Sequence, residues 1–158
     1  MIPKPNPTPF DYIGYYGPII LLIVTIMLMI ARTKVLILYI IFFIINTYLN
    51  KALKLLIREP RPAGNAIFND SENTKDSEQY GMPSGHAQSV AFTATFLYLF
   101  TKPTDRYRCV VTGAGFIGLI ALCQRYKYKR HSISQLLVGT TVGALVATLC
   151  NKIYTYKI

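Results

Sequence analysis

Apolar residues along this chain are gathered into long blocks, which charged and polar segments separate. Two blocks, Tyr12 to Ala31 and Ser132 to Asn151, each run for twenty residues without a charged side chain. Twenty residues is the length at which an α-helix crosses the hydrocarbon layer of a membrane. Within a block the apolar residues occur nearly all round a helix, as is typical of helices that face lipid. The pattern therefore predicts membrane-spanning helices.

Three further blocks complete the expected bundle. One block begins at Val35 and extends to Ile57 if its two lysines reach outward, and the other two, Ala87 to Thr101 and Cys109 to Gln124, are shorter. No water-soluble domain of this size could bury so many unbroken apolar runs. We therefore expect an all-α integral membrane bundle, with residues 1–158 in one domain. The expected helices are 12–31, 35–57, 86–101, 109–124 and 132–151.

The first block also bears on how the chain enters the membrane. It is too long for a cleavable signal peptide and lacks a small-residue cleavage site, so it is expected to be a retained anchor.

If each block crosses once, the N-terminal tail, the segment Lys51 to Gly85 and the segment Arg125 to His131 share one membrane face. Lysine and arginine number ten on that face and seven on the other. The positive-inside rule therefore gives little preference for either orientation.

The formal net charge of +10 would suggest nucleic acid as a partner if the chain were soluble. Here the 17 lysines and arginines fall almost wholly between the apolar blocks, so anionic lipid headgroups and phosphate are the expected partners instead.

Three cysteines, Cys109, Cys123 and Cys150, lie in or beside apolar blocks without the spacing of metal ligands, and are expected to be reduced packing residues.

Small residues recur every four positions at Gly139, Gly143 and Ala147. A ridge of this kind lets two helices approach closely in a membrane. We expect it to pack inside the bundle, although a homodimer would use the same surface.

Three polar segments contain residues that could form an active site, and the first runs from Lys54 to Pro62. Lys54 and Arg61 are seven residues apart, so two helical turns place them on one side before the prolines end the helix. The segment would serve equally as an ordinary charged helix end. Arg58 is either a third cation or a partner of Glu59.

The second segment reads Gly81-Met82-Pro83-Ser84-Gly85-His86 and directly precedes an apolar block. Proline and serine are good residues at a helix start, so the segment could be a capped N-terminus with a solvated histidine. The same geometry favours an anion site: we expect free backbone N–H groups at Ser84 and Gly85, the positive end of the helix dipole, and no obstructing side chain at Gly85.

The third segment runs from Arg125 to Gln135, at the edge of the last block. His131 and Gln135 are four residues apart and share a helical face, so the Gln135 oxygen could accept from one ring nitrogen of His131 and leave the other free to attack. The alternative is that the basic residues around His131 form only a collar that binds headgroups.

Taken together, these segments resemble the three-part signature of the phosphatidic acid phosphatase type 2 superfamily, which includes lipid phosphate phosphatases, polyprenyl diphosphate phosphatases and vanadium haloperoxidases. The matching elements are Lys54 with six intervening residues to Arg61-Pro62, Pro83-Ser84-Gly85-His86, and Arg125 with five intervening residues to His131. They span residues 54–135. Two positions depart from the usual pattern: Gln124 stands where most members have serine, and Gln135 where most have aspartate.

The resemblance implies a helical core like that of the haloperoxidases and a phosphoryl transfer without metal or cofactor. His131 would be the nucleophile that becomes phosphohistidine, and His86 the general acid and base. The phosphate-binding residues would be Lys54, Arg61, Ser84, Gly85 and Arg125. Gln135 would orient His131, although its neutral amide should stabilise the charged imidazole less than a carboxylate would.

The expected substrate is a phospholipid or isoprenoid phosphate, such as a polyprenyl diphosphate, because the residues lie at the membrane face. The first alternative is a water-soluble phosphomonoester. The second is a non-catalytic protein that binds anionic lipid, its site degraded by the two glutamines. The resemblance places the active site on the lumenal or extracytoplasmic face, in the endoplasmic reticulum if the chain is eukaryotic.

Overall fold

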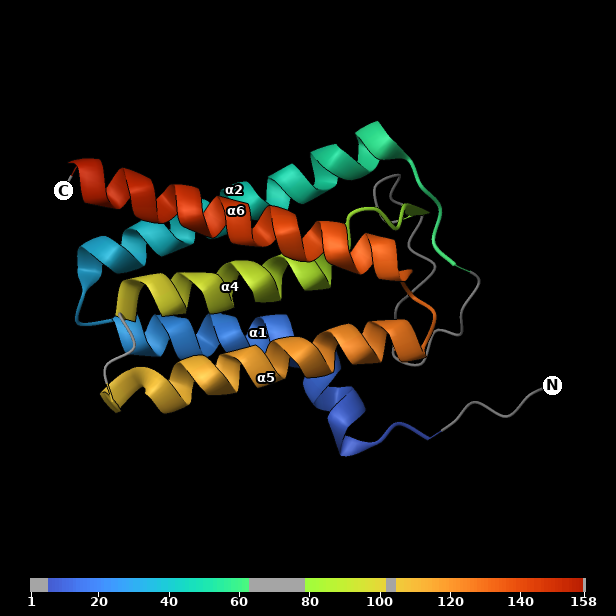
Figure 1. Ribbon diagram of the computed structural model, residues 1–158, viewed down its shortest axis with the longest axis horizontal. Helices are drawn as coiled ribbons and strands as arrows, with labels where there is room; N and C mark the ends of the chain where they lie inside the picture. Colours follow the sequence, from blue (N-terminus) through green and yellow to red (C-terminus); the bar gives the residue numbers. More distant parts are fainter. Residues whose placement is uncertain (1–5, 63–78, 102–104, 158) are drawn as a thin grey trace.

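The protein folds into a bundle of long helices (Figure 1). The computed structural model describes residues 6–62, 79–101 and 105–157. Five helices lie within these ranges, and no strand does beyond a single bridge between Pro60 and Tyr80. The all-α prediction is confirmed, and the bounds differ from the expected ones by up to six residues. The helices are α1 (Pro9–Met29), α2 (Thr33–Ile57), α4 (Gly85–Thr101), α5 (Asp105–Lys127) and α6 (Ile133–Lys157).

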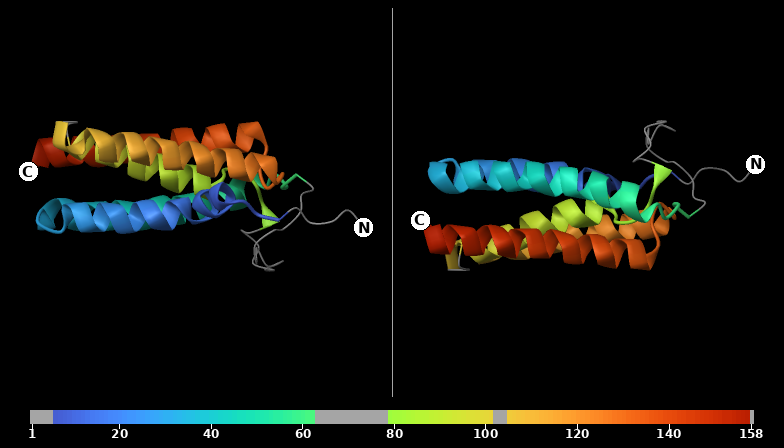
Figure 2. Two further views of the ribbon diagram at one scale, coloured as in Figure 1. Left: turned by 90° about the horizontal axis from the view of Figure 1, so that it is seen from below. Right: turned by 90° about the horizontal axis from the view of Figure 1, so that it is seen from above.

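Four of the described helices are long and apolar enough to cross a membrane, namely α1, α2, α6 and the Tyr107–Lys127 part of α5. The integral membrane prediction therefore holds, and the fifth described helix is the shorter α4. This helix has 17 residues and lies in the middle of the bundle, where it contacts all four other helices. Figure 2 shows it between a layer of α1 and α2 and a layer of α5 and α6.

The three polar segments meet at one end of the bundle, as the alternation of crossings predicted. In Figure 1 the start of α1, the end of α2, the start of α4 and the link from α5 to α6 all lie at the right-hand end. The turn between α1 and α2 and the end of α6 lie at the opposite end. Residues far apart in sequence are thereby placed on one face of the molecule.

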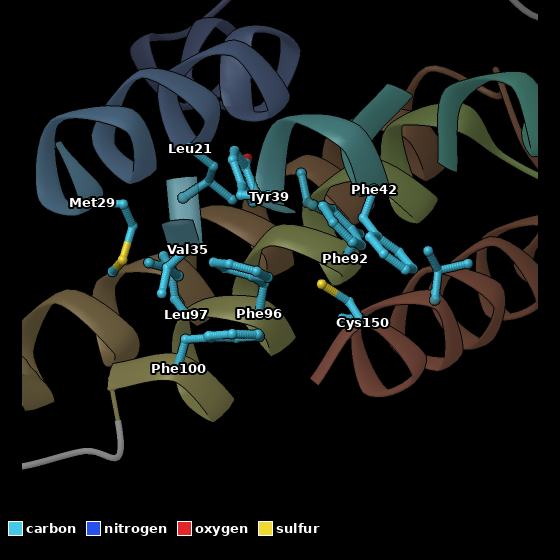
Figure 3. Packing of buried hydrophobic residues seen from close by; sticks show 14 of the residues in the cluster. Leu21, Met29, Val35, Tyr39, Phe42, Phe92, Phe96, Leu97, Phe100 and Cys150 are labelled. Atoms are coloured by element: carbon cyan, nitrogen blue, oxygen red, sulfur yellow. The ribbon is translucent and has the colours of Figure 1, made fainter. Parts of the chain in front are cut away.

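Aromatic side chains fill the bundle away from this end (Figure 3). The rings of Phe96 and Phe100 stack with their centroids 4.1 Å apart, and the Tyr39 ring of α2 lies 4.8 Å from Phe96. The Tyr39 hydroxyl and the Thr93 hydroxyl are 3.0 Å apart, so the one polar atom of this ring is satisfied. These rings hold α2 against α4 and leave the polar end of both helices in a fixed position.

Glycines bring α4 and α6 into close contact, as the small-residue ridge predicted. A Cβ atom at Gly139 would lie 2.6 Å from the Ser84 carbonyl oxygen, and one at Gly143 would collide with the Gln88 carbonyl oxygen. Ala147 is fully buried on the same ridge. The ridge therefore packs inside the chain, and the homodimer stays a prediction.

Helix α1 bends in its first half, as Figure 1 shows. Pro18 lies inside the helix. Proline cannot donate to the carbonyl four residues earlier, here that of Gly14, and its ring crowds that carbonyl. The first half of α1 lies against α5, where Gly14 meets Gln124, and Tyr15 contacts His86 and Arg125.

Candidate active site

His131 lies in the short link between α5 and α6 and is 4% exposed. Helix α5 ends through Lys129, whose φ of 51° is left-handed, and the Arg130 N–H donates to the Arg125 carbonyl at 3.0 Å. Ser132 then starts α6, since its hydroxyl accepts from the Gln135 N–H at 3.2 Å. The link therefore turns sharply and points the His131 ring into the protein.

Burial, together with nearby positive charges, favours the neutral form of His131. Burial, followed by the positive charges of Arg61 and Lys54, lowers the pKa of His131 to about 3. The Gln135 side chain acts in the opposite direction, and Arg125 adds a further, smaller depression of this pKa. At neutral pH a ring nitrogen of His131 therefore carries the lone pair that a nucleophile needs.

Gln135 contacts His131 in the way its spacing predicted. The Gln135 Oε1 atom lies 3.2 Å from Nδ1 of His131 and also accepts from the Ser132 N–H at 3.3 Å. The Gln135 amide nitrogen donates to Glu59 Oε1 at 2.7 Å and to the Pro60 carbonyl at 3.0 Å. Both halves of this amide are thus held by the residues around it.

The segment before α4 packs directly on the Gln135 amide. The Gly81 N–H donates to the Glu59 carbonyl at 2.7 Å, and a side chain at Gly81 would collide with the amide of Gln135. Glycine at this position is therefore required by a close approach and not by its backbone angles. The contact ties the second polar segment to the first and to the third.

Ser84 differs from its expected role in one respect. Its backbone N–H is not free, because it donates to the Gln135 carbonyl at 3.0 Å. The α4–α6 contact at Gly139 brings this carbonyl within reach. The Ser84 hydroxyl lies 3.4 Å from the Ala87 N–H, in the N-cap position. The amides left without a helical acceptor are therefore those of Gly85 and His86, the first two residues of α4.

Gly85 lies closer to α2 than we expected. A Cβ atom there would lie 3.2 Å from Asn50 Oδ1, so glycine makes room for α2. The Asn50 amide donates to Gln88 Oε1 at 2.8 Å and to the Pro83 carbonyl at 3.2 Å. Gln88 in turn donates to Asn46. This buried amide network fixes the start of α4 against α2.

The three signature cations converge on His131, because all three lower its pKa by their charge. Lys54 is buried at the end of α2 and donates to the Tyr80 carbonyl at 3.1 Å. Arg125 is 2% exposed, and Arg61 is half-buried. Arg58 is not part of the group: it is exposed, caps α2 in a left-handed conformation, and donates to the Leu55 carbonyl.

His86 lies at the same end of the bundle, in the first turn of α4. Its Nε2 atom is 3.1 Å from the Tyr15 carbonyl oxygen and also contacts the Arg125 guanidinium. His131, Arg61 and Arg125 all act electrostatically on the His86 ring. The two imidazoles and the three cations therefore belong to one site.

Tyr15 was not among the residues expected from the sequence. Besides its carbonyl contact with His86, its ring lies under the Arg125 guanidinium at 5.1 Å. Glu59, which holds Gln135, was also missed as a site residue. The sequence signal for Glu59 is its position two residues before Arg61, and Tyr15 lies outside the three polar segments.

Gln124, the other departure from the signature, lies buried beside α1. A Cβ atom at Gly14 would come within 2.6 Å of the Gln124 Cβ atom, and Gln124 Oε1 has no hydrogen-bond partner among the described residues. As for metals, His, Cys, Asp and Glu nowhere gather in threes within residues 6–62, 79–101 and 105–157.

Comparison with known sequences extends the signature to most of the chain. The model of the PAP2 superfamily matches residues 34–158. A dolichyldiphosphatase of Saccharomyces cerevisiae is 30% identical over 174 residues, which cover 93% of this chain and 70% of the relative. Dolichyldiphosphatase 1 of Homo sapiens is 32% identical over 119 residues, 65% of this chain and 46% of the relative. The chain thus spans about half the length of the human protein.

A lipid phosphate phosphatase, epsilon 2 of Arabidopsis thaliana chloroplasts, is 32% identical over 113 residues, 66% of this chain and 34% of the relative. Among solved structures, a transmembrane PAP2 type phosphatidylglycerolphosphate phosphatase from Bacillus subtilis superposes with a TM-score of 0.73. That likeness covers 94% of this chain and 76% of the other at 21% identity, and supports the fold. With the family model matched over four helices and the signature gathered at one end of the bundle, the chain belongs to the PAP2 superfamily as a membrane-embedded phosphoric ester hydrolase.

Proposed function

We propose that the protein hydrolyses a lipid phosphate or a polyprenyl diphosphate of the dolichyl type through a phosphohistidine intermediate. One observation carries this proposal: a neutral, oriented His131 lies at the end of the bundle where His86 and the signature cations converge. Lys127 and Lys129 are exposed, as a collar that binds headgroups would require. Such a collar would not account for the buried cations Lys54 and Arg125 beside His131.

In the first step, Nε2 of His131 attacks phosphorus in line with the leaving oxygen. The bond from phosphorus to that oxygen breaks, and His86, which enters this step in its protonated form, donates the proton that the oxygen takes up and becomes neutral. In the second step, His86 removes a proton from water as the water oxygen attacks phosphorus. Phosphate leaves, and His131 returns to its neutral form.

Lys54, Arg61 and Arg125 would surround the equatorial phosphate oxygens, and the Gly85 and His86 amides would add the positive end of the α4 dipole. The Ser84 hydroxyl completes this proposed cradle. Fixed positive groups of this kind stabilise the charge of the transition state and are usually the largest catalytic contribution. No metal or cofactor has a part in this scheme.

A lipid-like substrate is favoured by a groove beside the site. The groove has a volume of about 480 Å³ and lies between the first turn of α1 and the last three turns of α5, where Gln124 and Phe116 are among its lining residues. Phe116 and Leu119 are more than half exposed and face the lipid layer. An acyl or isoprenoid chain in this groove would reach Gln124, which precedes Arg125 in the sequence. Relatives named dolichyldiphosphatase and lipid phosphate phosphatase agree with this substrate class.

The test is hydrolysis by purified protein in detergent, with a phospholipid phosphate, a polyprenyl diphosphate and a water-soluble phosphomonoester compared side by side. We expect the two lipid substrates to be preferred, vanadate to inhibit, and Mg²⁺ to be unnecessary. His131→Ala should abolish turnover, and acid-labile phosphate should not accumulate on it. Full activity of His131→Ala would refute the proposed nucleophile, and inactivity of the unmodified protein would favour a degraded lipid-binding site.

We also propose that the active site faces the lumen or exterior, at the endoplasmic reticulum in a eukaryotic cell. Cysteine labelling from each side of the membrane tests this, after the native cysteines are replaced. Ser134→Cys reports the active-site end and Tyr156→Cys the other, since both positions are exposed. Labelling of residue 134 by an impermeant reagent only from the cytosol would reverse the proposed orientation.

A further inference from the structure

Gln135, the second departure from the family signature, is hydrogen-bonded to the carboxylate of Glu59. Gln135 Nε2 donates to Glu59 Oε1 at 2.7 Å, and Gln135 Oε1 lies 3.2 Å from His131 Nδ1. Glu59 comes from the segment after α2, and 76 residues separate it from Gln135. The direct pair of histidine and carboxylate expected in most relatives is here a chain of three residues.

The surroundings of the Gln135 amide allow only one orientation of it. On the nitrogen side, Glu59 Oε1 and the Pro60 carbonyl oxygen accept hydrogen bonds, and the carbonyl cannot donate one. On the oxygen side, the Ser132 N–H can only donate. A flipped amide would face acceptors with its oxygen and a donor with its NH₂ group. Gln135 Oε1 therefore points to His131.

This orientation decides the tautomer of His131. Because Gln135 Oε1 can only accept, Nδ1 of His131 must carry the proton, and Nε2 keeps the lone pair. The flipped amide would offer an N–H to Nδ1, which favours the tautomer with the proton on Nε2. A histidine in that form cannot attack phosphorus. The negative charge of Glu59 also favours the positive imidazole that forms on attack, through the polarised amide.

We infer that Glu59 is a positioning residue of the active site, which sets the tautomer of His131 through the Gln135 amide and supplies the carboxylate that position 135 lacks. This inference rests on the proposed role of His131 as nucleophile. It assigns Gln135 an active part in catalysis and accounts for the presence of Glu59 beside the first signature segment.

Glu59→Gln tests the role of the charge with little change in shape. We expect kcat to fall about 10- to 100-fold, as for loss of a hydrogen bond to a charged group, with KM nearly unchanged. Arg58→Gln is the control, because it removes a charge from the neighbouring position, where the side chain is exposed and lies outside the site. Its kcat should stay within about twofold. A wild-type kcat in Glu59→Gln would overturn the inference.

The decisive experiment places Glu59→Gln in a Gln135→Asp background. The carboxylate introduced by Gln135→Asp would contact His131 directly and would lie beside the Glu59 carboxylate, where like charges repel. We therefore expect Glu59→Gln to raise kcat in this background, the reverse of its effect in the native chain. A merely structural role would lower activity in both. If Glu59→Gln alone does not accumulate, the test is the kcat of the double variant divided by the kcat of Gln135→Asp. A ratio of one or less rejects the inference.

A spectroscopic readout is independent of turnover. The chain has only two histidines, so ¹⁵N-histidine labelling with a His86→Asn variant for assignment isolates the ring of His131. We expect the Nδ1–H tautomer in the native protein and a gain of the Nε2–H tautomer in Glu59→Gln. An unchanged tautomer would overturn the inference while leaving His131 as nucleophile, whereas an active His131→Ala would overturn the proposed function itself.

Discussion

The two histidines of the site are held in different ways. His131 is buried, and side chains of Gln135 and, through it, Glu59 fix one of its ring nitrogens. His86 is half-buried, and its contacts are the backbone carbonyl of Tyr15 and the guanidinium of Arg125. The proposed nucleophile is thus held by side chains alone, whereas the proposed acid is held by one side chain and one backbone carbonyl. Substitution can remove the side-chain contacts of both rings, but the contact with the Tyr15 carbonyl changes only if α1 moves.

The largest predicted effect separates the chemical roles of the two rings. His131→Ala should lose activity by about 10⁴-fold or more for every substrate, because every substrate needs the nucleophile. His86→Ala should lose about 10²- to 10⁴-fold with a lipid phosphate, whose alcohol leaves poorly. With p-nitrophenyl phosphate the first step needs no acid, so His86→Ala should release p-nitrophenol in a burst before the slowed hydrolysis of phosphohistidine. Rapid-mixing measurement of the first turnover on both substrates tests this. An equally slow first turnover on the two substrates would contradict the role of His86 as acid.

The next effect concerns the charge around His131. Arg61→Gln should lower kcat by about 10²- to 10³-fold, as for loss of one group that stabilises transition-state charge. It should also raise the pKa of His131 from about 3, because a positive charge that disfavours the imidazolium is gone. The neutral ring exists above its pKa, so the acid limb of kcat/KM should move to higher pH.

Arg61→Lys is the control for this shift, since it keeps the charge but changes the shape. Its acid limb should stay near that of the native protein even if its kcat falls. Ionisation of the substrate is common to all the profiles and cancels in the comparison. An acid limb that does not move in Arg61→Gln would mean that Arg61 lies too far from His131 to affect it.

The smallest effect concerns Tyr15, which contacts both His86 and Arg125. Tyr15→Leu removes the ring under Arg125 and should weaken vanadate inhibition about 3- to 30-fold, in line with the strength of a cation–π contact. Tyr15→Phe keeps the ring and the carbonyl, and so separates their contribution from that of the hydroxyl. Tyr48→Leu is the matched control, because Tyr48 has a similar contact with Lys51 at 5.5 Å on the outside of α2. Equal inhibition constants for Tyr15→Leu and Tyr48→Leu would exclude Tyr15 from the site.

The parts of this structure that follow from local pattern could be predicted from the sequence. Apolar blocks fix the helices, and their alternation puts Lys54, His86 and His131 at one end of the bundle. The contact between Gln135 and His131 is local as well, because four residues make one helical turn. The central place of α4 could not be predicted, because apolar residues on all sides suit both a lipid-facing and an enclosed helix.

The contacts that were missed join residues distant in sequence. Glu59 reaches Gln135 across 76 residues, and the Tyr15 carbonyl reaches His86 across 71. The expected free N–H of Ser84 was wrong for a related reason. Whether that N–H is free depends on how closely α6 approaches, and the approach depends on the absence of a side chain at Gly139. Sequence spacing indicates that two helices pack closely, but it does not indicate which carbonyl accepts a hydrogen bond from which N–H.

The hydrogen bond from the Ser84 N–H to the Gln135 carbonyl has a consequence for how this protein can diversify. It fixes the helix that starts the phosphate cradle to the helix that follows the nucleophile, with no room at position 139 for a larger residue. Evolution of a new substrate preference must therefore proceed on the opposite wall, through α1 and the lipid-facing side of α5. In a lineage of such chains, sequence change should concentrate in those two helices while the contact between α4 and α6 stays constant.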